Sequence, residues 1–146
     1  MKPTPKGWPR LSSSGYYMDA NAAIEWLCKT FGFEVRLKVD GEGGIVEHSE
    51  LVYGEALYMV GDVRRQKDKS RPFKSPKQTD GVCTQAIMIY VDDVDAHFAH
   101  AKASGATIAN EPVTSDYGEG YWSDRSYGVL DCDGHFWWFC QRLKTY

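Results

Sequence analysis

The chain has 146 residues, of which 42% are hydrophobic and 25% are charged, a composition typical of a globular protein. Its formal net charge of −3 argues against a general nucleic-acid binder, because such a protein needs a basic face to neutralise phosphates. The N-terminus is polar, and no apolar run approaches the ~20 residues that span a bilayer, so we expect neither a signal peptide nor a membrane partner.

The first half of the chain predicts the order strand, helix and three strands. Residues 10–17 are expected to form a strand, followed by a helix that Asp19 or Asn21 caps and Gly32 ends. Residues 33–39 alternate apolar and charged side chains, as in a strand with one buried face. Residues 40–44 form a turn, and two further strands are expected at residues 45–52 and 56–60.

Residues 61–81 differ in character from the segments around them. They carry seven Lys or Arg against three Asp, include Pro72 and Pro76, and lack apolar periodicity. We interpret this segment as a solvated linker rather than a binding patch, because isolated runs of charge usually face water. The sequence does not show whether it covers a binding site.

The second half repeats the order of the first. A strand is expected at residues 84–91, then a helix that Asp93 or Asp95 starts and Gly105 ends. The remaining predicted segments are a short strand at 107–109 continuing into 111–113, a loop at 116–124, and strands at 126–130 and 135–141. A turn at residues 131–134 joins the last two strands.

The two halves also correspond in spacing. Asp19 and Gly32 lie 13 positions apart, and so do Asp92 and Gly105. Only two copies of a unit this long occur, which indicates a tandem duplication rather than a solenoid.

Four cysteines are dispersed through the chain without a C-x-x-C spacing: Cys28, Cys83, Cys132 and Cys140. Free cysteine is usually buried and inert. We therefore interpret these residues as reduced thiols and expect a cytoplasmic protein.

The duplicated order, with V-D-D-V-D-A opening the second helix and D-C-D-G-H-F-W-W opening the last strand, resembles the vicinal oxygen chelate superfamily. This family contains glyoxalase I, bleomycin-resistance proteins, fosfomycin-resistance enzymes and extradiol dioxygenases. Residues 131–135, 124–128 and 48–51 most resemble its PhnB-like branch, with Cys132 where proline is usual.

The resemblance implies an α+β fold in which two tandem βαβββ modules form a half-open sheet that encloses a cleft. Residues 1–146 would then be a single domain, with module one at 10–60, the linker at 61–81 and module two at 82–142. The resemblance also implies a homodimer.

Metal-dependent members of the family hold the metal with His, Glu or Gln from four strand positions. The repeat places those positions at Ser13, Tyr58, Ala86 and Trp138, and none of these is an ordinary metal ligand. A slip of one residue would add only Gln85. We therefore expect no metal and no other cofactor.

Alternation along the strands predicts rings and apolar groups in place of a metal site. Ala86, Met88 and Tyr90 would share the cleft face with Phe136, Trp138 and Cys140. An aromatic concavity suits a small aromatic or cationic molecule. The complete predicted ligand-binding set is Ser13, Tyr58, Ala86, Met88, Tyr90, Trp122, Arg125 and Trp138.

Several of these residues have an alternative structural role. Tyr58 and Trp138 could line the cleft or fill a closed core. His48 and Glu50 could form an acid–base or chelating pair, or the polar outer face of a strand. Arg125 could anchor a ligand carboxylate or phosphate, or pair with Asp124 or Asp131.

Three functions follow from these observations. The first is a metal-free binding protein of the bleomycin-resistance type with an aromatic cleft. The second is a metal-dependent lyase, isomerase or dioxygenase that uses displaced ligands such as His48, Glu50 and Gln85. The third is a non-catalytic scaffold with a filled cleft. Whether the protein is an enzyme stays open at this point.

Overall fold

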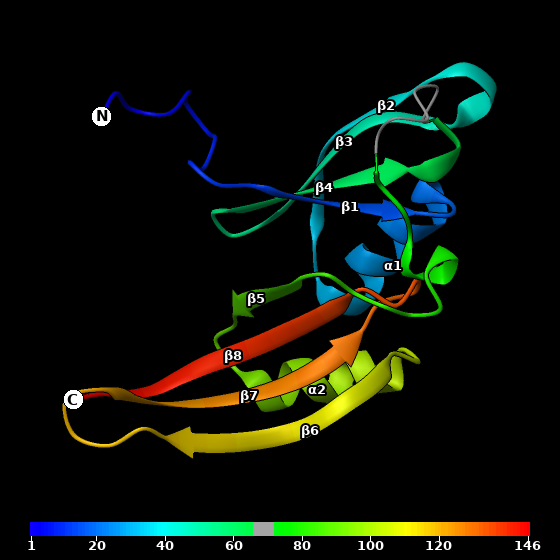
Figure 1. The fold of residues 1–146 in the computed structure, drawn as a ribbon. Coiled ribbons are helices and arrows are strands. Elements are labelled where there is room, and N and C mark those ends of the chain that lie inside the picture. The colour runs from blue at the N-terminus through cyan, green and yellow to red at the C-terminus, as the bar shows by residue number, and fades with distance from the viewer. Residues whose placement is uncertain (66–71) are drawn as a thin grey trace. The chain divides into compact units, whose positions relative to one another are not determined.

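The computed structural model describes residues 1–65 and 72–146. They form two compact units, Met1–Asp80 and Gly81–Tyr146. Each unit holds one α-helix and one four-stranded mixed sheet (Figure 1). The predicted α+β class with tandem βαβββ modules is confirmed.

The first unit has the strand order β1-β4-β3-β2, in which β1 and β4 are parallel and the other pairs antiparallel. Its elements are β1 (Ser13–Tyr17), α1 (Ala20–Phe31), β2 (Glu34–Asp40), β3 (Val46–Tyr53) and β4 (Ala56–Asp62).

Helix α1 begins and ends where the sequence predicts. The Asp19 side chain accepts a hydrogen bond from the Ala22 amide at 3.2 Å, and Gly32 adopts a left-handed conformation with φ of 85°. The helix contacts all four strands of its sheet. The core of this unit includes Tyr17, Leu27, Phe31, Leu51 and Val60.

Asp62 links the end of β4 to the start of α1. Its buried carboxylate accepts the Ala20 amide at 2.9 Å and the Arg64 guanidinium at 2.7 Å. Burial alone would raise the pKa of Asp62, but the hydrogen bonds from Arg64 and Ala20 outweigh it and lower the pKa. The carboxylate therefore stays ionised where it fixes the helix N-terminus.

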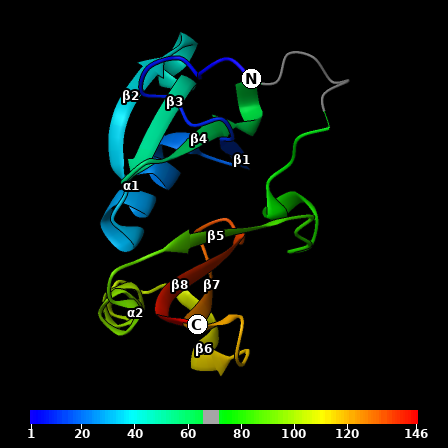
Figure 2. The ribbon, with the colours of Figure 1, turned by 90° about the vertical axis from the view of Figure 1, so that its left-hand side faces the viewer.

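The second unit has the corresponding strand order β5-β8-β7-β6, with β5 and β8 parallel (Figure 2). Its elements are β5 (Ala86–Tyr90), α2 (Val94–Ala103), β6 (Thr107–Asp116), β7 (Trp122–Leu130) and β8 (Phe136–Thr145). Asp93 caps α2 by accepting the Ala96 amide at 2.9 Å.

Three strands of the second unit, β6, β7 and β8, are longer than the sequence predicts, whereas β5 is shorter than the expected 84–91. Strand β6 extends to Asp116, and β7 begins at Trp122, inside the segment expected to be a loop. The backbone ladder explains the difference, because Asp116 pairs with Ser123 and Trp122 pairs with Thr145. Cross-strand hydrogen bonds thus continue beyond the apolar alternation that marks a strand in sequence.

The expected linker also differs at its start. Strand β4 extends to Asp62, and short 3-10 helices follow at Val63–Arg65 and Pro76–Gln78. Later in the segment, Phe73 stacks on Tyr16 of β1 with ring centroids 4.4 Å apart, so the chain around Phe73 packs on the first sheet. Residues 66–71 of the expected linker lie outside the described residues.

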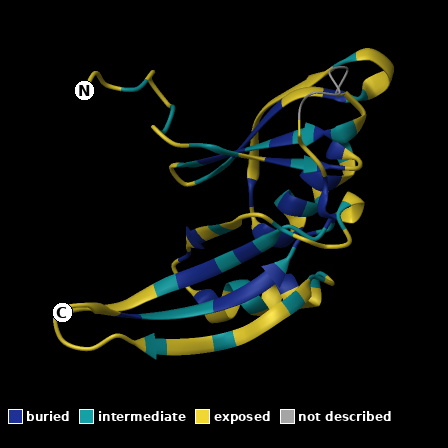
Figure 3. Ribbon diagram, viewed as in Figure 1, coloured by how far each residue is buried: buried dark blue, intermediate teal, exposed yellow. Residues whose placement is uncertain are grey.

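The edge strands β2 and β6 are largely exposed, whereas the buried residues of the second sheet lie mainly on β7 and the first half of β8 (Figure 3). Among the described residues, no helix is long and apolar enough to cross a membrane.

Candidate functional site

Helix α2 covers one face of the second unit's sheet. The His97 ring lies 4.1 Å from the ring of Phe139, and Phe98 meets Tyr127 edge-on at 5.3 Å. Trp137, Tyr127 and Phe139 are fully buried beneath the helix. We call the opposite side of this sheet, the side away from α2, the open face of the second sheet.

The open face carries the apolar residues that alternation along β5 and β8 predicts. The register pairs Ala86 with Phe136, Met88 with Trp138 and Tyr90 with Cys140. Directly paired residues point to the same side of a sheet, so these six side chains share one face. Met88 is 54% exposed and Tyr90 is 46% exposed, which is unusual for adjoining apolar groups.

Phe136 and Trp138 form the apolar end of this face. Their ring centroids lie 5.1 Å apart. On the neighbouring strand, a Cβ added at Gly128 would lie 2.8 Å from the Phe136 ring and 2.7 Å from the Asn110 side chain. Glycine therefore leaves the space that Phe136 occupies on the face.

A ring–cation cluster forms the other end of the open face. The Arg142 guanidinium of β8 lies 5.4 Å from the Tyr90 ring and 5.0 Å from the Trp122 ring. Because β8 lies between β5 and β7, Arg142 receives one ring from each neighbouring strand. We call Tyr90, Trp122, Asp124 and Arg142 the ring–cation cluster.

Asp124 is the anion of this cluster. Its carboxylate accepts Arg142 Nε at 2.5 Å and the Tyr90 hydroxyl at 3.4 Å, and Arg142 Nη2 donates to the Tyr90 hydroxyl at 2.6 Å. The Asp124 side chain is 14% exposed, against 35% for Arg142. The hydrogen bond to Asp124 raises the pKa of Arg142, so the guanidinium stays charged.

Arg125 lies on the other face, contrary to the prediction that it lines the ligand site. Its guanidinium donates to the Asp95 carboxylate of α2 at 2.8 Å and to the Thr114 hydroxyl at 3.2 Å. Neighbouring residues of a strand point to opposite sides, so Asp124 and Arg125 cannot both serve the open face. The predicted pairing with Asp124 or Asp131 is replaced by the pair with Asp95.

Tyr58 lies in the interior of the first unit rather than on an exposed wall. It is 3% exposed, its hydroxyl lies 2.9 Å from the Tyr17 hydroxyl, and its ring contacts Phe33. Ser13 pairs directly with Tyr58 and so shares its face of the sheet. Of the two roles the sequence allows for Tyr58, filling a core describes its surroundings.

His48 and Glu50 do form a pair, on the sheet face that does not carry the buried Leu51. His48 Nε2 lies 2.9 Å from the Glu50 carboxylate, which also accepts Arg36 Nε at 2.8 Å. Hydrogen bonding to His48 lowers the pKa of Glu50; burial opposes this, and Arg36 adds to the lowering. The Arg36 guanidinium in turn lies 4.8 Å from the Trp8 ring, so the N-terminal segment packs beside this pair.

The residues at the four positions that the repeat assigns to metal ligands do not fit a metal ion. Ser13, Tyr58, Ala86 and Trp138 offer no His, Glu or Asp donor, and Gln85 stands alone. Within residues 1–65 and 72–146, no group of three or more His, Cys, Asp or Glu side chains is placed to hold a metal ion.

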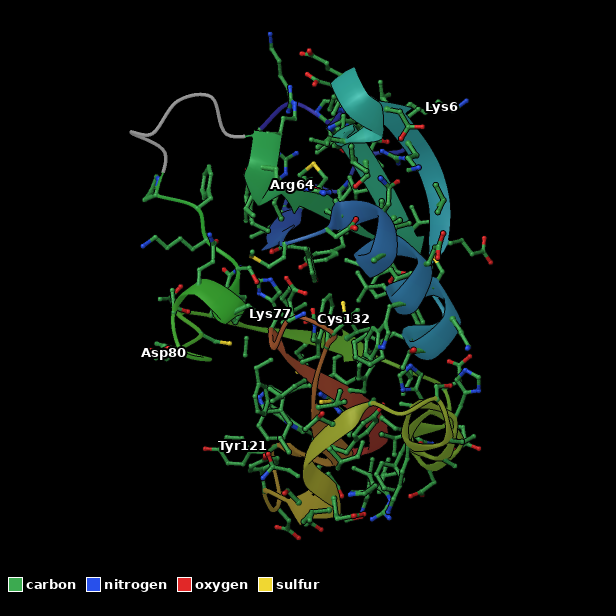
Figure 4. All side chains as sticks on the ribbon, turned by 90° about the vertical axis from the view of Figure 1, so that its right-hand side faces the viewer. Lys6, Arg64, Lys77, Asp80, Tyr121 and Cys132 are labelled. Carbon is green, nitrogen blue, oxygen red and sulfur yellow. The ribbon has the colours of Figure 1, made fainter. Side chains whose placement is uncertain are left out.

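The D-C-D-G-H turn, in which Cys132 lies between β7 and β8 (Figure 4), is held by the side chain of Asp131. One Asp131 carboxylate oxygen accepts the amides of Asp133, Gly134 and His135 at 3.0 to 3.1 Å. The other accepts the Trp137 indole N–H at 3.0 Å. The turn thus positions β8, whose next residues carry the open face.

Sequence reasoning missed Arg142 and Asp124 as site residues. A basic residue near the end of a strand and an acidic residue in an expected loop carry no signal by themselves. Two steps of alternation beyond Trp138 lead to Arg142, so a longer prediction for the last strand would have placed it on the open face.

The family of the chain is indicated by direct comparison. Residues 16–139 match the sequence model of the Glyoxalase/Bleomycin resistance protein/Dioxygenase superfamily. No curated protein matches the chain.

Several solved structures resemble it. TioX from Micromonospora sp. ML1 is 28% identical, with 90% of this chain and 98% of that chain covered and a TM-score of 0.70. A glyoxalase-related enzyme from Fulvimarina pelagi is 15% identical, with coverages of 90% and 87% and a TM-score of 0.67. The integron cassette protein VCH_CASS1 of V. cholerae is 17% identical, with 97% of each chain covered and a TM-score of 0.65. The last two show similarity of fold alone.

Proposed function

Because the chain belongs to the glyoxalase/bleomycin resistance protein/dioxygenase superfamily, we propose that it is a metal-free small-molecule binding protein. Its ligand is a flat aromatic molecule that stacks on the open face of the second sheet. The observation that carries this proposal is the gathering of Met88, Tyr90, Trp122 and Trp138 on that face, three of them at least 39% exposed.

Energetics supports binding at this face. Burial of apolar surface contributes about 25 cal/mol per Å², and a ring of tryptophan or tyrosine offers a flat area with few rotamers to fix. Phe136 and Trp138 supply an apolar end, and the ring–cation cluster supplies a polar end that can orient the ligand. Few precisely placed polar groups within an apolar surface are typical of small-molecule sites.

The test is a thermal-shift and calorimetric screen with flat aromatic compounds of one to three rings. A ligand that binds only the folded state raises the midpoint of unfolding. We expect at least one compound of such a panel to bind. Its affinity for Trp138→Ala should be at least tenfold weaker than its affinity for the unchanged protein. Arg125→Ala is the control, because Arg125 lies on the covered face and pairs with Asp95. Equal loss in both variants would contradict the proposed location.

A second candidate function rests on the His48–Glu50 pair. An imidazole held by a buried carboxylate is suited to acid–base chemistry or to a metal site built on these two side chains. Elemental analysis of protein purified without chelator distinguishes it from the binding protein. About one Ni, Co, Zn, Mn or Fe per chain, lost in His48→Ala, would favour a metal-dependent lyase, isomerase or dioxygenase. The third candidate, a scaffold with a filled site, is favoured if no aromatic compound and no metal binds.

We further propose that the protein belongs to the PhnB-like branch, forms a homodimer and is cytoplasmic. The first two rest on the family resemblance. The third rests on four cysteines that are all free thiols in the structure. Light scattering at micromolar concentration and thiol titration of freshly purified protein test the oligomer and the redox state.

A further inference from the structure

Arg142 occupies a position that is chemically suited to a cation from outside the chain. Two aromatic rings, Tyr90 and Trp122, contact its guanidinium, and the Asp124 carboxylate is its counterion. Rings attract a cation through their quadrupoles, most strongly where water is excluded. The Tyr90 hydroxyl adds an acceptor for a planar N–H donor.

We propose that Tyr90, Trp122 and Asp124 form a cation-binding site that the Arg142 guanidinium occupies in the absence of ligand. A planar cationic ligand binds there by displacing Arg142. The ligand class is an aromatic ring bearing an amidinium, guanidinium or protonated amine. Its ring would extend the stack on the open face, and its charged group would take the place of the guanidinium beside Asp124. This inference deepens the proposed function and rests on it.

The displacement is physically reasonable because Arg142 is partly exposed. Its side chain is 35% exposed, so the guanidinium can return to water without a buried charge being left behind. The carboxylate of Asp124 is 14% exposed and would remain paired, since the ligand brings the replacement cation. Loss of one charge-assisted pair is therefore offset by formation of another.

Arg142 then acts as a tethered competitor. A tethered group competes at an effective concentration on the order of millimolar or more. The apparent affinity of a ligand falls in proportion to the fraction of molecules in which its site is free. Removal of the Arg142 side chain should for this reason strengthen the binding of a planar cation, the opposite of what loss of an ordinary contact residue does.

The experiment compares three naphthalene probes that differ only in charge: 2-naphthamidine, 2-naphthamide and 2-naphthoate. Each is titrated calorimetrically into the full chain and into its Arg142→Ala variant. We expect 2-naphthamidine to bind Arg142→Ala at least tenfold more tightly than the unchanged protein, and the amide to change less than threefold. Replacement of Asp124 by Asn in the Arg142→Ala background should remove most of this gain.

The matched control is Arg125→Ala. Arg125 is also a strand arginine paired with an aspartate, at 2.8 Å, but it lies on the covered face and contacts no ring among the described residues. The Arg125→Ala substitution should leave the affinities for all three naphthalene probes unchanged. If Arg142→Ala melts at a markedly lower temperature, Arg142→Gln, which keeps an N–H donor without the charge, serves in its place.

The outcomes separate the two proposals. If 2-naphthoate is the preferred probe and loses its affinity in Arg142→Ala, Arg142 anchors anions, the inference is overturned and the proposed function stands. If all three probes bind alike and Arg142→Ala changes none of them, the inference likewise fails while stacking on the open face survives. If no probe binds any variant, both proposals fail.

Discussion

The hydroxyl groups of Tyr17 and Tyr58 lie 2.9 Å apart in the interior of the first unit. Tyr58 is one of the positions that the sequence repeat assigns to a metal ligand, and its side chain joins the core beside Phe33. The aromatic content of this protein thus serves two purposes: rings such as Tyr58 and Trp137 are buried within the two units, whereas Tyr90 and Trp122 are exposed on the second sheet.

Tyr58→Phe should cost about 1 kcal/mol of unfolding free energy, the usual worth of a buried hydrogen bond. It should leave the affinity for aromatic ligands unchanged, because the ring stays in the core. Urea denaturation and calorimetry measure the two quantities on the same preparation. If the variant loses ligand affinity and keeps its stability, Tyr58 belongs to the ligand-binding site.

Gly15 is required by the ring that lies over it. A Cβ added there would lie 1.7 Å from the Tyr58 hydroxyl oxygen and 2.8 Å from the ring carbon that bears it. Gly15→Ala should therefore destabilise the protein by about 1–3 kcal/mol, the range for overpacking a core. In the double variant with Tyr58→Phe the two costs should be less than additive, because the closest contact is gone. If the losses of unfolding free energy in the two single variants simply add in the double variant, this explanation is wrong.

Asp62 makes the stability of the first unit depend on acid. Its pKa is lowered in the folded protein, so its contribution is fully present above the unfolded value of about 3.9 and is lost as the pH falls through the lower folded pKa. Asp62→Asn should reduce stability at pH 7 and flatten the loss of stability below pH 4. Denaturation midpoints from pH 2.5 to 7 test this. Asp40→Asn is the control, because Asp40 is exposed. If the stability of Asp62→Asn and of the unchanged protein varies with pH in parallel, Asp62 is not the source of the acid dependence.

Asp131 should be the least replaceable residue of the last turn. Asp131→Ala removes the acceptor of three backbone amides and of the buried Trp137 indole N–H. Unsatisfied buried donors cost about 1–3 kcal/mol each, although water can reach some of them, so we expect a loss of about 2–4 kcal/mol. His135→Ala keeps the backbone amide that Asp131 accepts and should cost less than Asp131→Ala. A larger effect at His135 than at Asp131 would show that the imidazole fixes the turn.

Local chemistry explains why much of the fold could be predicted. Asp19 and Asp93 each accept an amide three residues on, so each helix start depends on neighbours in sequence. The shared face of Met88 and Trp138 follows from the alternation of strand residues and was also predictable. Neither conclusion needs knowledge of distant contacts.

Two points that the sequence left open or placed differently depend on which side of a strand the helix covers. Residues 56–60 are apolar at nearly every position, so alternation could not show that Tyr58 faces the core beside Tyr17. Arg125 and Trp122 are close in sequence, yet only the register of β7 places them on opposite faces, with Arg125 against Asp95.

The sequence by itself determined the duplicated βαβββ order, the helix boundaries and the apolar side of β5 and β8, because each rests on residues a few positions apart. Only the tertiary structure decided that Arg142 lies between Tyr90 and Trp122 with Asp124 as its counterion. These four residues come from three strands, and the cluster exists because hydrogen bonding sets β8 between β5 and β7. Strand order and register are properties of the folded sheet, and they determine the specificity of the proposed site because they bring these four residues together.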